Sequence, residues 1–162
     1  MIIHVKNKNT FIIGDFKFKC CVGKNGLKYN KKEGDYTTPK GLYNLKRLYF
    51  RKDHVGMPKC KIRKKIIKKN MAWCDDPTDK RYNEEIKIYN KKLKENLYRA
   101  DHKYDYLISI SHNEKKIPNK GSAIFIHLTD DYKPTAGCIA LRKKDFEILL
   151  KLIDKKTKVK IG

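Results

Sequence analysis

The chain has 162 residues, of which 40 are Lys or Arg and 18 are Asp or Glu, and it carries a formal net charge of +22. That length fits a single domain over residues 1–162, large enough to bury a core without metals or disulfides. The positive charge is spread along the chain and is nearly all lysine, whereas recognition of phosphate and bases favours clustered arginine, so it argues against nucleic acid and fits an anionic polymer such as a cell wall.

The composition also bears on membranes, disulfides and metals. No stretch approaches the roughly 18 apolar residues of a membrane span, and the first residues lack the apolar core and cleavage site of a signal peptide. The five cysteines are an odd number, which argues against a disulfide framework. His54, Cys60 and Cys74 are only loosely spaced and lack the regular intervals of a zinc site. We therefore expect no metal and no organic cofactor.

The first half of the sequence is typical of strands separated by turns. Residues 1–6 and 10–22 are rich in β-branched and aromatic side chains, and residues 23–41 then predict a long polar loop containing glycine, Asn, Asp and Pro. Apolar residues return at 41–50 with imperfect alternation, which favours a strand over a helix. Lysines crowd residues 59–69, and we interpret this stretch as a solvated sheet edge.

The middle of the chain predicts a loop followed by mixed structure. Residues 71–106 contain the only tryptophan and several tyrosines, and a short helix near residues 84–98 fits the pattern. Residues 104–111 and 122–128 then read as strands. The second is nearly all apolar, so we expect it to be buried on both faces, with His127 near its end.

The last forty residues predict a helix and a final strand. Four apolar residues recur at helical spacing behind Asp145, whose charge suits a helix N-terminus: Phe146, Leu149, Leu150 and Ile153. Residues 157–161 then alternate polar with apolar side chains. Strands before and after one late helix indicate a mainly β, β-rich α+β fold.

Cys138 is the residue with the clearest chemical potential. It follows Gly137 directly, and His127 ends a strand eleven positions earlier. A thiol becomes a nucleophile when an imidazole takes its proton, and a glycine lets a substrate carbonyl approach the amides of Gly137 and Cys138. Composition and spacing leave two interpretations open, a nucleophile or a small apolar residue that fills a strand.

Recurring motifs connect this site to a known family. Four stretches from the last forty or so residues resemble the catalytic end of the L,D-transpeptidases with a YkuD-type domain: SAIFIHL, PTAGCIAL, KKDFEILLKLI and KVKIG. Upstream, GKNGLKYNKKEGDYTTPKGLYNL resembles that family's glycine-punctuated loop and TP-x-G turn. WCDDPTDKRYN and YRADHKYDYLISISHN resemble the branch that carries the TAGC motif. The resemblance implies a sandwich or barrel of mixed sheets.

The resemblance implies a cysteine acyltransferase that acts on peptidoglycan stem peptides in cell-wall biogenesis and cell shape. In the family, the motif cysteine attacks the carbonyl of the third stem residue and expels the terminal D-alanine. An amine of a second stem then takes the acyl group and forms a 3,3 cross-link. Cys138 matches the nucleophile, His127 the general base and acid, and Gly137 the oxyanion-hole glycine. Thr135 matches the family's Ser or Thr, whose hydroxyl binds substrate or holds the loop.

The sequence departs from the common S/T-H-G-C-x-R motif at two positions. Ala136 replaces the histidine and Ala140 the arginine, which removes a polar group and a cation from the neighbourhood of the thiol. Arg142 then offers a displaced positive charge or a solvent-facing helix start. The identity of the acceptor thus stays open between an amine and water. With water as the acceptor, the protein would be an L,D-carboxypeptidase. A weakly active peptidoglycan-binding module is the alternative of another class.

Two further expectations concern the surroundings of the site. Trp73, Tyr82 and Asn83 are candidate substrate-binding residues, since aromatic and amide groups suit a polar peptide, and each could equally serve the core or a turn. The family resemblance implies the periplasm or cell envelope as the location, although the absence of a visible signal peptide leaves the cytoplasm open.

Overall fold

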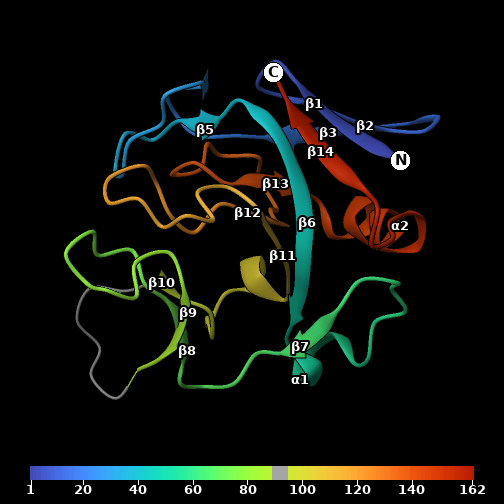
Figure 1. Ribbon diagram of the computed structural model, residues 1–162. Helices are drawn as coiled ribbons and strands as arrows, with labels where there is room; N and C mark the ends of the chain where they lie inside the picture. The colour runs from blue at the N-terminus through green and yellow to red at the C-terminus, as the bar shows by residue number, and fades with distance from the viewer. Residues whose placement is uncertain (89–94) are drawn as a thin grey trace.

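The computed structural model describes residues 1–88 and 95–162. Its main feature is a nine-stranded sheet in the order β11-β12-β13-β3-β2-β1-β14-β6-β7, and because β11 also pairs with β6, the sheet closes into a barrel (Figure 1). The strands of the sheet are β1 (Ile2–Lys6), β2 (Thr10–Ile13), β3 (Phe16–Cys21), β6 (Gly41–Phe50), β7 (Lys64–Ile66), β11 (Tyr106–Ile110), β12 (Phe125–Leu128), β13 (Ile139–Leu141) and β14 (Lys158–Ile161). The predicted mainly β fold is confirmed.

Both ends of the chain lie in this sheet. The C-terminal strand β14 runs parallel to β1 and antiparallel to β6, so it fills the place between them. Polar and apolar side chains alternate along β14, so Val159 and Ile161 face the core and are buried, while Lys158 and Lys160 are exposed. Because β1 and β14 are parallel, the chain begins at one end of this strand pair and finishes at the other, and Figure 1 shows the two termini apart on the same half of the molecule.

Strands β6, β11 and β12 each contribute to two separate cores. In β6, Leu48 and Phe50 enter the main core, while Tyr49 points to the opposite face and into a second, smaller one. β11 and β12 alternate in the same way, with Leu107 and Phe125 in the second core. This confirms that residues 122–128 include a strand buried on both faces, because both faces are covered by other parts of the chain.

The late helix closes the main core. α2 (Lys143–Leu152) buries Phe146, Leu149 and Leu150 on one face, and Ile153, which caps its end, is fully buried. The ring of Phe146 stacks on Tyr106 of β11 at a centroid distance of 5.5 Å and an interplanar angle of 6°. The predicted amphipathic helix is thereby confirmed.

A three-stranded sheet covers the second core. It consists of β8 (Met71–Trp73), β9 (Glu85–Lys87) and β10 (Glu95–Asn96), in the order β10-β8-β9. The prediction of a helix near residues 84–98 is therefore wrong for both ends of that range, where the structure has strands. Residues 89–94, in the middle of the range, lie outside the described residues. The local sequence alternates Ile86 with polar neighbours, and Ile86 is buried beneath the sheet.

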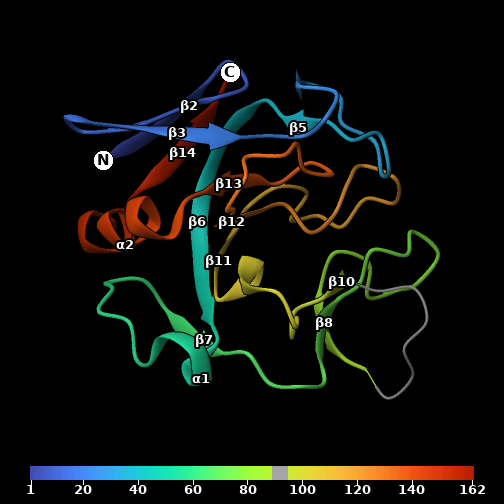
Figure 2. The same cartoon turned by 180° about the vertical axis from the view of Figure 1, so that it is seen from behind.

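Short elements complete the structure. α1 (Lys52–Val55) follows β6, the 3-10 helix η1 (His102–Tyr104) precedes β11, and β4 (Leu27–Lys28) pairs in parallel with β5 (Thr38–Pro39). The loops of residues 22–40 and 129–137 extend to the same side of the barrel as the small sheet, as both views show (Figures 1 and 2). The edge predicted at residues 59–69 is confirmed, because β7 is the last strand of the sheet order.

None of the five cysteines, all of which lie in the described part of the chain, forms a disulfide. Cys20 and Cys21 are both buried, although adjacent side chains of a strand point to opposite faces, because loops cover the outer face of β3 at its end. Among the described residues, no helix has the length and apolar character needed to cross a membrane.

Candidate active site

Strand register places Cys138 and His127 on one face of the barrel wall. β12 and β13 run in parallel, with His127 opposite Ala140. Side chains directly opposite each other share a face, and Cys138 lies two residues before Ala140, so it points to the same side. Both residues line one cavity of about 430 Å³, together with Gly137, Thr135, Lys31 and Tyr104. The structure thus brings together the four residues predicted around the thiol.

The Cys138 thiol is half-buried and held by two backbone groups. Its Sγ donates to the carbonyl of Ala123 at 3.1 Å and accepts from the amide of Phe125 at 3.3 Å. Burial raises the pKa of Cys138 to about 12, against the lowering effects of the Phe125 amide and the Lys31 charge. A thiol with this pKa is protonated near neutral pH.

The His127 imidazole is buried and oriented by its own strand. Its Nδ1 lies 2.8 Å from the carbonyl of Leu128, and because a carbonyl only accepts, Nδ1 carries the proton. Burial lowers the pKa of His127 to about 4, so the ring is neutral and Nε2 holds a free lone pair. The ring of Tyr104 packs edge-on at 5.2 Å. This is the tautomer that a general base on Nε2 requires.

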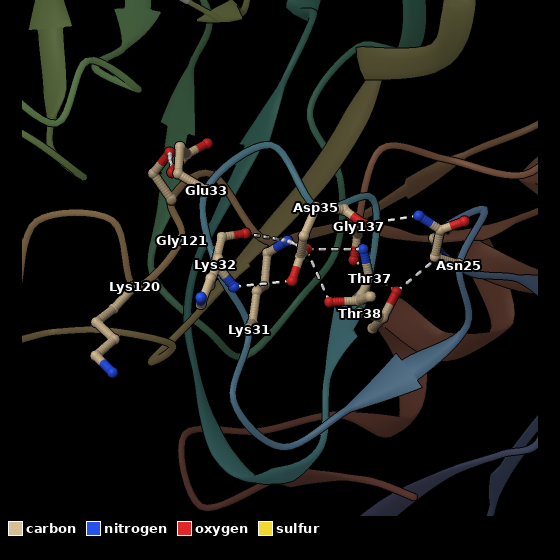
Figure 3. Close-up of polar contacts among 12 residues, drawn as sticks. Asn25, Lys31, Lys32, Glu33, Asp35, Thr37, Thr38, Lys120, Gly121 and Gly137 are labelled. Carbon is tan, nitrogen blue, oxygen red and sulfur yellow. Dashed lines mark hydrogen bonds and ion pairs between the residues drawn. The ribbon is translucent and has the colours of Figure 1, made fainter.

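The loop before Cys138 is cross-linked by two threonine hydroxyls. Thr135 Oγ1 donates to the Cys138 carbonyl at 2.6 Å and accepts from the Gly137 amide at 3.1 Å. Thr38 Oγ1 donates to the Gly137 carbonyl at 2.7 Å, and it accepts from the Gly23 amide at 2.8 Å (Figure 3). Thr135 therefore holds the loop, which is one of the two roles considered for it.

Gly137 is required by its backbone and its surroundings. Its φ of 147° lies in the region open to glycine, and a Cβ at this position would stand 2.9 Å from the Thr37 carbonyl oxygen. Its amide is already bonded to Thr135, whereas the Cys138 amide donates to no acceptor among residues 1–88 and 95–162. One free amide is thus available to an oxyanion, rather than the two expected.

Asn83 supports the backbone that holds the thiol. Its Oδ1 accepts from the Trp73 indole at 2.9 Å and from the Ala123 amide at 3.2 Å, and its Nδ2 donates to the carbonyls of His112 and Asn113. Asn83 and Ala123 both have positive φ, 57° and 52°. The fully bonded side chain thus fixes the strained backbone of Ala123, whose carbonyl accepts the hydrogen bond from the Cys138 thiol.

Trp73 and Tyr82 also have partners within the protein. The Trp73 ring packs edge-on against Phe125 and Tyr49. Tyr82 is buried, donates its hydroxyl to Glu33, and accepts from the Gly121 amide. Trp73 and Asn83 line a separate cavity of about 300 Å³ together with Phe125. The structure does not place these three residues in the Cys138 cavity, and substrate binding by them stays a prediction.

The two alanines of the motif lie on different parts of the cavity. Ala140 is fully buried beside His127, and Ala136 is exposed in the loop. Arg142 does not take the place of the missing cation, because its guanidinium lies over the Tyr132 ring, 5.2 Å from the centroid. Sequence reasoning missed Lys31, Tyr104 and Ala123, and for Lys31 the only signal was its place in the glycine-punctuated loop.

A cluster of His54, His102 and Asp105 has atoms close enough to ligate a metal. Asp105 accepts from both rings, with His54 Nδ1 at 2.5 Å and His102 Nδ1 at 2.8 Å. Arg51 Nη2 lies 2.9 Å from His54 Nε2, and a guanidinium only donates, so Nε2 accepts and Nδ1 keeps its proton. A metal at Nδ1 would need the opposite tautomer against Arg51. We therefore interpret the cluster as a hydrogen-bonded support of η1.

Comparison with known proteins gives a family and two related folds. The family model of the L,D-transpeptidase catalytic domain, YkuD, matches residues 2–161. No curated protein matches the chain in sequence. The structure is similar to the helical cell shape determining protein Pgp2 from Campylobacter jejuni, with 20% identity, a TM-score of 0.52, and coverage of 99% of this chain and 46% of that one.

Bd1075 from Bdellovibrio bacteriovorus has a similar fold, with 13% identity, a TM-score of 0.51, and coverage of 99% of this chain and 47% of that one. At these identities the likeness concerns the fold. The chain spans about half the length of each of these two proteins.

Replacing Asn83 by alanine tests its supporting role. The change removes four hydrogen bonds and leaves alanine at positive φ, so we expect the free energy of unfolding to fall by about 3 kcal/mol. Urea denaturation measures it. Asn25→Ala is the control, because Asn25 is exposed and its side chain makes one hydrogen bond within the described residues, to the Asp35 carbonyl. Equal losses in both variants would contradict the role.

The pH dependence of alkylation tests the state of the thiol. With a pKa near 12, the rate of Cys138 modification by iodoacetamide should rise about tenfold per pH unit from pH 7 to 10 without a plateau, because only the thiolate reacts. Mass analysis of the peptide that carries Cys138 separates it from the other cysteines. A plateau below pH 9 would show that the thiol is instead activated in the free protein.

Proposed function

The chain belongs to the family of YkuD L,D-transpeptidase catalytic domains, and we propose that it is a cysteine acyltransferase acting on peptidoglycan stem peptides. The observation that carries the proposal is the arrangement on one cavity wall. The Cys138 thiol, the neutral His127 ring with a free Nε2, and the free Cys138 amide lie together there. These are a nucleophile, a base and an oxyanion donor.

The proposed reaction begins with transfer of the thiol proton. The thiol turns from the Ala123 carbonyl toward His127, and Nε2 takes its proton as Sγ attacks the carbonyl of the third stem residue. Because the pKa values of the two groups, about 12 and about 4, disfavour a thiolate–imidazolium pair in the empty cavity, the proton moves as the C–S bond forms. The resting enzyme therefore holds an unreactive thiol until substrate arrives.

The second half of the reaction returns the proton. The tetrahedral oxyanion lies at the Cys138 amide, the C–N bond breaks, and His127 Nε2 protonates the departing D-alanine amine. A thioester on Cys138 remains. An amine acceptor then gives its proton to Nε2 and attacks the thioester, and the thiol regains the proton as it leaves. With an amine of a second stem as acceptor, the product is a 3,3 cross-link.

The surrounding chain supports this assignment. We propose that residues 1–162 form one catalytic domain, because the family model spans nearly all of them and both termini lie in the barrel sheet. We place its action in the cell envelope, where peptidoglycan lies. The net charge of +22 favours association with an anionic wall polymer.

Hydrolysis is the second candidate reaction, and one observation favours it. Ala136 and Ala140 line the cavity with methyl groups where the common motif has polar side chains, so neither can hold an acceptor amine by hydrogen bonding. Water would then attack the thioester, and the protein would act as an L,D-carboxypeptidase. A weakly active binding module is favoured only by the high pKa of the thiol.

Labelling with a carbapenem tests the acyltransferase proposal. Such compounds acylate this family's cysteine, so intact-mass analysis should show one adduct on the native protein and none on Cys138→Ala. His127→Ala should slow labelling about a hundredfold, because the base is lost. A native protein that gains no adduct, or an adduct that persists in Cys138→Ala, would contradict the proposal.

The products from a stem tetrapeptide distinguish the two reactions. We expect chromatography and mass spectrometry to show a cross-linked dimer together with released D-alanine. Free tripeptide without dimer would assign the carboxypeptidase reaction. Release of neither product, with retained peptidoglycan binding in Cys138→Ala, would leave only the binding module.

A further inference from the structure

A buried lysine reaches the wall of the Cys138 cavity from a distant part of the chain. Lys31 lies in the loop between β4 and β5, and its side chain is only 4% exposed. It nevertheless lines the same cavity as Cys138 and Gly137. Burial of an ammonium group is costly unless the charge is compensated, so this position needs an explanation.

The nearest compensation comes from Asp35, four residues on. Lys31 Nζ lies 2.8 Å from Asp35 Oδ1. Figure 3 shows the two side chains facing each other. Asp35 also accepts from the amides of Lys32 and Thr37 and from the Thr37 hydroxyl. Burial would raise the pKa of Asp35, but these hydrogen bonds outweigh it and hold the pKa well below the ordinary value.

Asp35 thus has several hydrogen-bond partners, whereas Lys31 has a hydrogen-bond donor that these contacts do not use. An ammonium group has three N–H donors. Within the described part of the chain, one meets Asp35 and a second reaches the Lys32 carbonyl at 3.4 Å, which is a long contact. At least one donor therefore remains for a group that enters the cavity.

The free end of Lys31 lies beside the nucleophile's loop. A Cβ built on Gly137 would stand 3.2 Å from Lys31 Nζ, so the ammonium occupies the space that a side chain would take next to Cys138. The Lys31 charge also lowers the pKa of Cys138, against the larger effects of burial and of the Glu95 charge, which both raise it. Both observations place the positive charge within electrostatic reach of the sulfur.

The other cations around the cavity are balanced by carboxylates or exposed to solvent. Arg99 makes two bonds to Asp101, and Lys133 is 82% exposed beside Asp131. Lys103 is exposed at the mouth. The motif itself supplies no charge, because Ala140 stands where the common pattern has arginine. Lys31 is thus the buried cation next to the thiol.

We propose that Lys31 determines specificity by receiving the carboxylate of the residue that leaves during acylation. The identity of that residue rests on the proposed function. In a terminal residue the carboxylate is separated from the scissile nitrogen by a single carbon, so it lies close to Gly137 when the carbonyl is next to Cys138. The site therefore selects peptides that end one residue after the scissile bond.

A purely structural role for the ion pair makes a different prediction. If Lys31 and Asp35 only clamp the loop to Gly137, removing either partner should loosen the site and change reactivity in the same direction. If the Lys31 charge receives a carboxylate, removing it weakens anion binding, while removing the Asp35 charge strengthens it. The two substitutions therefore separate the alternatives.

Alkylation of Cys138 by iodoacetate and iodoacetamide measures the charge without requiring acyl transfer. The reagents differ in having a carboxylate or an amide next to the reacting carbon, and the ratio of their rates cancels any change in the thiolate fraction. Lys31→Met should lower the iodoacetate-to-iodoacetamide ratio about tenfold, and Asp35→Asn should raise it about threefold. Peptide mass analysis assigns the label to Cys138.

Two variants serve as controls. Lys31→Arg keeps the charge and should retain most of the ratio. Lys133→Met removes an exposed charge from the same cavity and should change the ratio less than twofold, because solvent screens it. Thermal melting checks that each variant is folded, and Lys31→Arg and Asp35→Asn still decide the matter if Lys31→Met does not fold.

An unchanged ratio in Lys31→Met, or a fall in both Lys31→Met and Asp35→Asn, would overturn the proposal. A failure of the acyltransferase proposal is seen separately, as the absence of a carbapenem adduct on a protein whose Cys138 still reacts with iodoacetate. The two proposals can therefore fail independently.

Discussion

The pairing of β11 with β6 is the constraint on which the rest of the structure depends. β6 pairs with β14 along its first half and with β11 along its second, which closes the barrel. Because side chains alternate, this wall has one face in the main core and the other in the second core. A register shift of one residue would turn His127 away from the face that carries Cys138. The geometry of the site is thus set by backbone pairing far from the chemistry.

The burial that stabilises the barrel wall also sets the protonation states of Cys138 and His127. Cys138 and His127 are both desolvated, and desolvation disfavours the charged form of each group. The neutral thiol is held by the Ala123 carbonyl, and the neutral imidazole by the Leu128 carbonyl. A protonated thiol resists oxidation. In the proposed reaction, a substrate carbonyl approaches this thiol, which gives up its hydrogen bond to Ala123.

Local patterns in the sequence predicted the strands and the late helix, and the family resemblance predicted the Cys138–His127 pair. Helical spacing of Phe146, Leu149 and Leu150 and alternation in residues 158–161 both correspond to observed burial. The predicted helix near residues 84–98 failed because its described ends pair with β8 as strands, and long-range pairing overrides weak local preference. The role of Asn83 was hidden for a similar reason, since its partners lie at positions 73, 112, 113 and 123.

The two alanines of the motif differ in their surroundings, because Ala136 is exposed and Ala140 is fully buried beside His127. An arginine at position 140 would place a cation against the imidazole and lower the pKa of His127 further. A positive charge comes instead from Lys31, which lies beside Gly137 and is anchored by Asp35. Thr38, which begins β5 directly after the loop that carries Lys31, bonds to Gly137 across 99 positions of sequence. The segment of residues 31–38 therefore both holds the backbone at Gly137 and carries the charge beside Cys138, so the shape of this segment and the electrostatics of the site are coupled.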